Sequence, residues 1–94
     1  RTMDNEVLEN AAASRFELAI GDEVALAYYR YEDGRYVLTH TEVPQALSGQ
    51  GIGTRLAQGV FRILGQRNAR IIAKCPFMSA FAVKHPEFNA MLDG

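Results

Sequence analysis

The stretch of sequence that decides the fold reads Pro44-Gln-Ala-Leu-Ser-Gly-Gln-Gly-Ile-Gly53. Its last five residues hold three glycines at alternating positions, and a helical pattern of apolar residues follows. Because glycine has no Cβ, several backbone N–H groups can converge there on an anion at the entry to a helix. The stretch predicts a phosphate-binding bend, and the simpler interpretation of the same glycines is a tight helix entry.

The bend lies between two strand-like runs and one helix. Residues 36–43 precede it as a strand, and an amphipathic helix is predicted over residues 51–66 because apolar residues recur there at steps of four, four and three. These apolar residues are Ile52, Leu56, Val60 and Ile63. The short apolar run 69–75, bounded by Pro76, suits a buried parallel strand. Strand, helix and strand form a βαβ unit, which is right-handed in nearly all proteins.

Residues 14–43 predict a three-stranded antiparallel meander. Apolar and polar residues alternate over residues 14–20, and residues 23–32 are rich in the aromatic and branched residues that suit a pleated surface. Asp33-Gly34 then predicts a type I′ hairpin turn, whose two central positions need positive φ.

The two ends of the chain complete the predicted α/β (α+β) fold. Residues 1–13 show no clear period and are expected to form an N-terminal lead-in or a short helix. Residues 77–84 are expected to form a C-terminal helix that ends before Pro86, and a short end segment follows. Residues 14–94 are therefore predicted to be one domain, an antiparallel meander extended by a parallel strand through a crossover helix.

Composition narrows the class of protein. The chain has 94 residues and a net charge of -1, which gives no global positive field for nucleic acid or a membrane surface. One cysteine cannot form an intramolecular disulfide, and one cysteine with two distant histidines lacks the spacing of a metal site. No apolar run approaches the roughly 18 residues of a membrane span. The sequence predicts a cytoplasmic, metal-free domain with no nucleic-acid or membrane partner.

Two phosphate-binding patterns fail on spacing. A P-loop needs Lys and then Ser or Thr after its last glycine, whereas Gly53 is followed by Thr54-Arg55. A dinucleotide fingerprint that starts at Gly49 would place its third glycine at Thr54, and no acidic residue closes the next strand-like run. The bend therefore belongs to a different kind of phosphate loop.

The window Ser48-Gly-Gln-Gly-Ile-Gly53 resembles the pyrophosphate loop of the GNAT superfamily of acyl-CoA-dependent N-acyltransferases. That loop has Arg or Gln, two residues, Gly, one residue, and Gly or Ala; the glycines match here, and Ser48 stands in place of the Arg or Gln. His40-Thr-Glu-Val-Pro44 precedes the window, and Cys75-Pro-Phe77 and His85-Pro-Glu-Phe88 follow it. Over residues 14–90 the chain thus resembles the short stand-alone branch of N-acetyltransferase-like domains, which are little more than an acetyl-CoA-binding core.

The resemblance implies acetyl-CoA as the cofactor. Two sets of residues would bind it: a strand edge that hydrogen-bonds the pantetheine arm, and backbone amides that take the pyrophosphate. The edge is Thr41, Glu42 and Val43, and the amides are those of Gly49, Gln50, Gly51, Ile52, Gly53 and Thr54. The 3′-phosphate of CoA would meet a basic side chain, and the sequence offers Arg55, Arg62, Arg67, Arg70 and Lys84 without choosing among them.

Acetyl transfer to an amine needs a base for the amine and a proton for the departing thiolate. Full superfamily members often supply that proton from a tyrosine of the last helix, where this chain has phenylalanines. Cys75 and His40 lie near the carboxyl ends of two predicted parallel neighbours, so both are expected to reach one crevice. Cys75 would act as acid or acyl carrier, and His40, with Glu42, as base. In the simpler interpretation Cys75 is a small buried hydrophobe and His40 bonds a backbone carbonyl.

The predicted function is an acetyl-CoA-dependent N-acetyltransferase that acts on an unidentified amine of a protein or a small molecule. The alternative is a non-catalytic acyl-CoA-binding or protein-interaction module, and a third class is a nucleotide-binding regulator. Because the segments that usually form the acceptor site are missing, a homodimer is one way in which a second copy would complete it.

Overall fold

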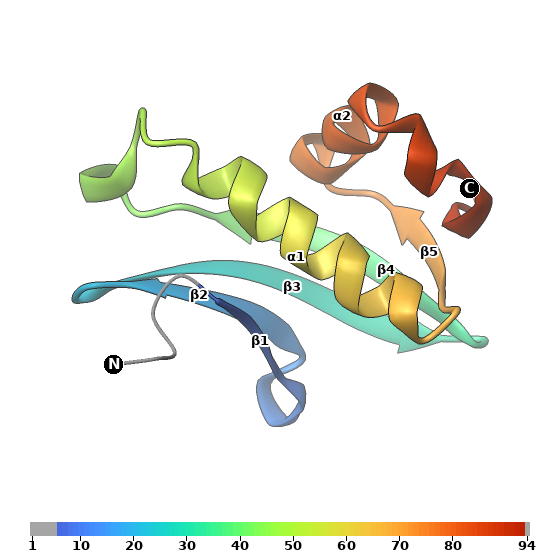
Figure 1. Ribbon diagram of the computed structural model, residues 1–94. Helices are drawn as coiled ribbons and strands as arrows, with labels where there is room; N and C mark the ends of the chain where they lie inside the picture. The colour runs from blue at the N-terminus through green and yellow to red at the C-terminus, as the bar shows by residue number, and fades with distance from the viewer. Residues whose placement is uncertain (1–5, 94) are drawn as a thin grey trace.

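The computed structural model describes residues 6–93 (Figure 1). Five strands form one sheet in the order β1-β2-β3-β4-β5, in which the first four are antiparallel and β5 runs parallel to β4. The strands are β1 Val7–Asn10, β2 Arg15–Ile20, β3 Glu23–Glu32, β4 Arg35–Glu42 and β5 Arg70–Ala73. The helices are α1 Ile52–Gln66 and α2 Pro76–Lys84, and short 3₁₀ helices lie at Ala11–Ala13, Gln45–Leu47 and Pro86–Met91. The predicted α/β architecture, with its crossover helix and terminal helix, is confirmed.

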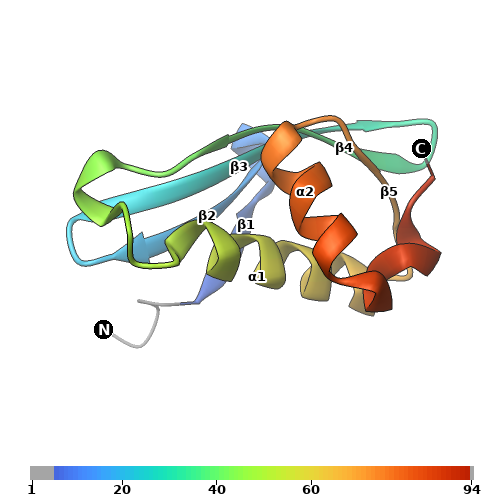
Figure 2. The same ribbon diagram turned by 90° about the horizontal axis from the view of Figure 1, so that it is seen from above.

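Both α-helices lie on the same face of the sheet (Figures 1 and 2). The predicted apolar side of α1 faces the strands, and Leu56, Val60 and Leu64 have no exposed surface. Ile63, at the border of that side, is only partly buried. Phe16 and Leu18 of β2 complete the centre of the core from the sheet. The apolar period of α1 therefore positions the helix over the sheet and fixes the end that carries the glycine bend.

The hairpin predicted from Asp33-Gly34 is present. Asp33 has φ 52° and Gly34 has φ 76°, so both central residues have positive φ, as a type I′ turn requires. The turn joins β3 to β4 in antiparallel register, with Glu32 opposite Arg35.

The prediction of a lead-in or short helix over residues 1–13 is wrong for the part that forms a strand, whereas Ala11–Ala13 do form a short 3₁₀ helix. Val7–Asn10 form strand β1, which pairs with β2 from Val7 opposite Leu18 to Asn10 opposite Arg15. The meander therefore has four strands instead of three; residues 1–5 lie outside the described part of the chain. Four residues are too few to show a period in sequence, and β1 also contacts residues that are distant in sequence.

One such contact set ties β1 to the carboxyl end of α1. The Glu9 carboxylate accepts hydrogen bonds from the Tyr29 hydroxyl and from Arg67, each at 2.5 Å, and Arg67 also donates to the Tyr36 hydroxyl at 3.0 Å. The hydrogen bond from Arg67 lowers the pKa of Glu9, and burial next to Glu9 raises the pKa of Tyr29 to about 12. These hydrogen bonds connect β1, which the sequence did not predict, to β3 and to the end of α1.

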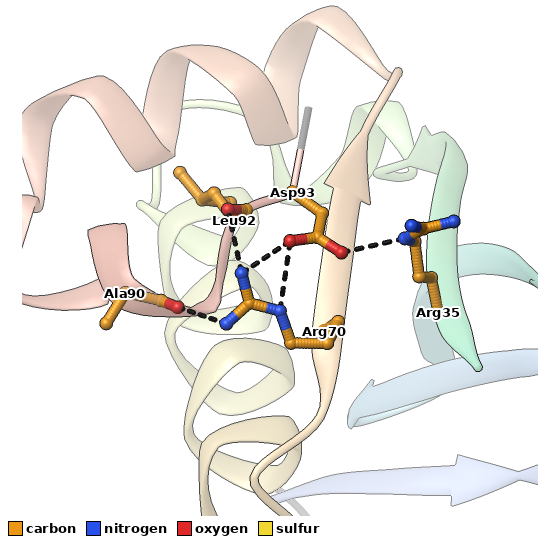
Figure 3. Close-up of polar contacts among 5 residues, drawn as sticks. All are labelled: Arg35, Arg70, Ala90, Leu92 and Asp93. Carbon is orange, nitrogen blue, oxygen red and sulfur yellow. Dashed lines mark hydrogen bonds and ion pairs between the residues drawn. The ribbon is translucent and has the colours of Figure 1, made fainter. Parts of the chain in front are cut away.

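The end segment after Pro86 packs against the outer edge of β5. Leu92 forms a parallel bridge with Ile71, and the Asp93 N–H donates to the Ile71 carbonyl at 2.8 Å. The Asp93 carboxylate accepts from Arg70 and, at 2.7 Å, from Arg35 (Figure 3). Arg70 also donates to the carbonyls of Ala90 and Leu92. We call Arg35, Arg70 and Asp93 the C-terminal clamp.

Candidate active site

The sheet opens between β4 and β5. Their pairing ends where Leu38 lies opposite Ala73, and the Leu38 carbonyl accepts from the backbone N–H of Lys74 and of Cys75, at 3.0 and 2.9 Å. Strand β4 continues to Glu42, whereas the chain after β5 enters α2. The last residues of β4 therefore lie beyond the reach of β5, at the carboxyl ends of two parallel neighbours, where ligands of open α/β sheets bind.

A β-bulge in β4 decides which side chains face each side of this opening. Tyr28 pairs with His40 and Tyr29 pairs with Leu38, so Thr39 is an extra residue. Its hydroxyl donates to the Tyr28 carbonyl at 3.3 Å. Because strand neighbours alternate between faces, the extra residue turns His40 away from the helices. If Thr39 instead paired with Tyr28 in a regular ladder, His40 would lie opposite Ala27, on the helix face.

His40 and Cys75 consequently lie on opposite faces, not in one crevice as the topology alone predicted. Thr41 pairs with the buried Ala27 on the helix face, and its hydroxyl oxygen is 3.3 Å from the Cys75 Sγ. Cys75 occupies the N-cap position of α2 without a side-chain capping hydrogen bond, and it is 5% exposed. The thiol and the Thr41 hydroxyl therefore meet on the helix side of the opening.

His40 belongs to a polar row on the face that no described helix covers, which we call the open face; it carries Arg15, Glu17, Tyr28, His40 and Glu42. The His40 side chain is 59% exposed, and its Nε2 lies 3.2 Å from a Glu42 carboxylate oxygen. Its ring stacks on Tyr28 with centroids 6.1 Å apart, and the Arg15 guanidinium lies 5.8 Å from the same Tyr28 ring.

At the Arg15 end of this row, the charges of Arg15 and Glu17 compensate each other. Glu17 accepts from Asn10 at 2.9 Å and from Arg15 at 2.7 Å, and these hydrogen bonds, the one from Asn10 first, lower the pKa of Glu17. At the other end of the row, Glu42 contacts His40. The row thus places a paired carboxylate and imidazole beside the opening, with solvent in front of them.

The glycine bend forms an uncapped helix entry. Gly49 and Gly51 have φ of 78° and 72°, which is the left-handed conformation that favours glycine. Gly51 is the N-cap of α1, and the first turn has neither a side-chain cap nor an acidic residue. The Arg55 N–H is bonded to the Gly51 carbonyl at 3.1 Å, so the N–H groups before it are the ones that intrahelical bonds cannot satisfy. Such N–H groups suit an anion.

These N–H groups border a hollow of about 280 Å³, which we call the cradle. Its lining is Val43, Leu47, Ser48, Gly49, Gly51, Ile52, Gly53, Thr54 and Phe77. Six of the predicted cofactor residues are among them. The other three differ in place: the Gln50 amide donates to the Ala46 carbonyl at 3.4 Å, Thr41 faces Cys75, and Glu42 lies on the open face.

Sequence reasoning missed Leu47, Ser48 and Phe77 as parts of this lining. The place of Phe77 in this lining is explained by a contact with Gly53 that only the structure reveals. A Cβ on Gly53 would lie 2.8 Å from the Phe77 ring, so Gly53 leaves room for an aromatic side chain of α2 against the first turn of α1. Pro76 predicts where α2 begins, but its sequence does not show which helix Phe77 meets.

Fold and site together define a small α/β domain with a glycine-lined hollow beside two parting parallel strands. The family model for GCN5-related N-acetyl-transferase matches residues 15–91, and the chain belongs to this family. The solution structure of a Staphylococcus aureus protein described as GCN5-like superposes with a TM-score of 0.72 over 97% of this chain and 90% of that one. The two are 24% identical in sequence, so this likeness supports the fold. No curated protein sequence matches the chain. The predicted family and fold are confirmed.

Proposed function

We propose that the protein is an acetyl-CoA-dependent N-acetyltransferase that acetylates an amine. The observation that carries the proposal is the uncapped entry of α1, which opens into the cradle next to the parted ends of β4 and β5 in a chain of this family. An acyl-CoA has an anionic pyrophosphate and a long, uncharged arm. The uncapped entry of α1 suits the pyrophosphate, and the parted ends of β4 and β5 beside it suit the arm.

The residues present fit this cofactor. The backbone N–H groups of Ile52, Gly53 and Thr54 would hold the pyrophosphate, because the helix dipole and the free donors favour negative charge there. The edge of β4 from Thr41 to Val43, which β5 does not pair with, would bind the amide groups of the pantetheine arm. Bound acetyl-CoA supplies an acetyl group that is activated as a thioester.

The two faces of the opening divide the acid and base roles. On the open face, His40 with Glu42 would take the proton of an amine that approaches from solvent, where both side chains are more than half exposed. On the helix face, the Cys75 thiol, held by the Thr41 hydroxyl, would return a proton to the departing sulfur. Because the base and the acid lie on opposite faces of the sheet, the Cys75 thiol does not pass its proton directly to His40.

Calorimetric titration with acetyl-CoA, CoA and ATP tests the cofactor. Gly51→Asp puts a carboxylate at the mouth of the cradle, while Gly51→Asn has nearly the same shape and similar tolerance of positive φ without the charge. We expect wild type to prefer acetyl-CoA and CoA to ATP. The Asp variant should bind acetyl-CoA at least tenfold more weakly than the Asn variant, about 1.4 kcal/mol. Equal affinity of the two variants would remove the phosphate role of the cradle.

Turnover distinguishes the enzyme from a non-catalytic acyl-CoA-binding module. Wild-type protein that binds acetyl-CoA should release CoA in the presence of a panel of primary amines, and a thiol-reactive dye would report it. Binding without amine-dependent release would support the module instead.

A further inference from the structure

Tyr28 lies at the centre of the polar row on the open face. It pairs with Arg15 of β2 on one side and with His40 of β4 on the other, so the three residues form one line across three strands. Side chains of residues directly opposite each other in neighbouring strands lie on one face and are in reach of each other. Tyr28 is therefore the residue of β3 that lies against the proposed base.

The Tyr28 ring has a neighbour on each side. The His40 ring stacks on it with centroids 6.1 Å apart and 24° between the two planes. On the side of β2, the Arg15 guanidinium lies over the same ring, and its Nη1 donates to the Tyr28 hydroxyl at 3.4 Å. Arg15 is held in turn by Glu17 at 2.7 Å. The ring is thus fixed from the β2 side and presents a flat surface to His40.

The backbone of Tyr28 also acts on the segment that carries His40. Its carbonyl accepts from the Thr39 hydroxyl at 3.3 Å, at the bulge that turns His40 to the open face. Such bulges change the direction of the side chains that follow them. Contacts with one residue therefore influence both the direction in which His40 leaves the strand and the plane of its ring.

The second contact of the imidazole distinguishes its two nitrogens. The Nε2 of His40 lies 3.2 Å from a Glu42 carboxylate oxygen. An ionised carboxylate only accepts hydrogen bonds, so Nε2 carries the hydrogen, and in the neutral imidazole Nδ1 is then the nitrogen without one. Nδ1 is therefore the atom that can take a proton from an amine.

The contact with Glu42 alone holds the imidazole weakly. The side chains of His40 and Glu42 are 59% and 55% exposed, and pairs of exposed charged groups contribute little. A stacked aromatic ring restricts the imidazole without competing for either of its nitrogens. Tyr28 thus adds a restraint that leaves the hydrogen-bonding groups of His40 available.

We propose that Tyr28 is a positioning residue for His40: its ring holds the imidazole with Nε2–H on Glu42 and leaves Nδ1 for the amine. The proposal rests on the proposed function, because it takes His40 as the base. Nδ1 accepts a proton from the ammonium form of the acceptor, which gives an imidazolium next to the Glu42 carboxylate. The amine keeps the electron pair of the broken N–H bond and attacks the thioester carbonyl with it. Tyr28 itself forms and breaks no bond.

Nitrogen-15 NMR of histidine-labelled protein tests the positioning without any turnover. At about pH 9 free imidazoles are neutral, and the shifts of Nδ1 and Nε2 report which nitrogen carries the hydrogen. We expect the Nε2–H form for His40. The internal control is His85, whose Nδ1 lies 2.9 Å from the Phe81 carbonyl oxygen and should carry its hydrogen. In Tyr28→Ile the His40 shifts should move toward those of a freely rotating imidazole, while those of His85 stay.

Turnover with acetyl-CoA and an accepted amine tests the consequence for the reaction. Isoleucine keeps the preference for a strand and removes the ring. The matched control is Tyr31→Ile, which removes a tyrosine of the same strand whose ring contacts Tyr36. We expect Tyr28→Ile to lower kcat about tenfold with KM for acetyl-CoA unchanged, and Tyr31→Ile to stay within about twofold of wild type. Tyr28→Phe, which keeps the ring, should restore most of the loss.

A double-mutant cycle with Glu42→Gln measures whether the two contacts act on the same imidazole. Glu42→Gln should lower kcat less in Tyr28→Ile than in wild type, because effects on one shared group are not additive. Fully additive losses would mean that Tyr28 acts on something other than the His40–Glu42 pair, which overturns the proposal.

The remaining outcomes separate the proposal from the proposed function. His40 shifts in Tyr28→Ile that equal those of wild type overturn the positioning role, as does a loss of kcat that is as large in Tyr31→Ile. In both cases the proposed function stands, because wild type still acetylates the amine. Wild type without amine-dependent turnover overturns the proposed function, and the NMR shifts then still decide whether Tyr28 orders His40. Thermal melting checks that each variant is folded at the assay temperature.

Discussion

One inserted residue in β4 decides which chemistry faces each side of the sheet. Thr39 is left out of the ladder with β3, and this bulge places His40 on the open face and Thr41 against Cys75. His40 and Thr41 are neighbours in sequence and therefore lie on opposite faces of the sheet. In the proposed mechanism this separation keeps the base in solvent, where the amine arrives, and the thiol in the protein, where the leaving sulfur is held.

The Cys75 thiol can be tested alone because its removal changes little volume. Cys75→Ala should reduce the free energy of unfolding by about 1 kcal/mol and leave acetyl-CoA affinity unchanged. Turnover should fall by roughly tenfold to a thousandfold if the thiol acts as acid or carrier. Stopped assays with a saturating amine measure this step.

Intact-mass spectrometry separates the two roles of the thiol. When the amine is withheld, an acyl carrier accumulates as an acetylated Cys75, and a proton donor leaves the mass of the chain unchanged. Wild-type turnover in Cys75→Ala would make the thiol structural, a small buried group bonded to Thr41.

At the scale of single elements, the C-terminal clamp closes the outer edge of β5. An edge strand exposes unpaired backbone groups, and the bridge from Leu92 to Ile71 covers one end of this edge. The Arg70 and Arg35 guanidiniums beside Asp93, Arg70 first, hold the pKa of that carboxyl at about 2, well below its ordinary 3.8. The clamp is therefore an ion pair whose strength depends on pH.

The clamp predicts a specific loss of stability in acid. Folding lowers the pKa of Asp93, so the unfolded chain takes up this proton first as the pH falls. The stabilisation is complete above about pH 4 and is lost as the pH falls through about 2. Urea unfolding should show a midpoint that drops across this range, and Asp93→Asn should flatten the drop. A variant as steep as wild type would show that other carboxyls, such as Glu9, carry it.

At the scale of the whole molecule, the sequence predicted those parts whose cause is local. The apolar period of α1, the Asp33-Gly34 turn and the glycine bend each act within a few residues, and each lies where it was predicted. Strand β1 contacts residues far along the chain, such as Arg67, which binds Glu9 from 58 positions away, and no local pattern reveals such a contact. The direction of His40 depends on a register shift between two strands, which residue types alone do not encode.

Two glycines of α1 test whether β1 belongs to the same cooperative unit as the rest of the sheet. A Cβ on Gly59 would lie 2.2 Å from the Val7 Cγ2 and 2.5 Å from its Cβ, so α1 lies directly on β1 there. A Cβ on Gly65 would meet Met91 at an ordinary 3.5 Å. Both positions are helical, so alanine gains the same backbone preference at each, about 0.5–1 kcal/mol.

Gly65→Ala should therefore stabilise the protein, and Gly59→Ala should destabilise it by about 1–3 kcal/mol, because Val7 must move and β1 with it. For a domain of this size each kcal/mol shifts the melting temperature by roughly 4–8 °C, which thermal unfolding resolves easily. Amide hydrogen exchange of Gly59→Ala, measured below its melting temperature, should show β1 opening before the other strands. If both alanines raise the melting temperature, β1 does not pack closely on α1 at Gly59.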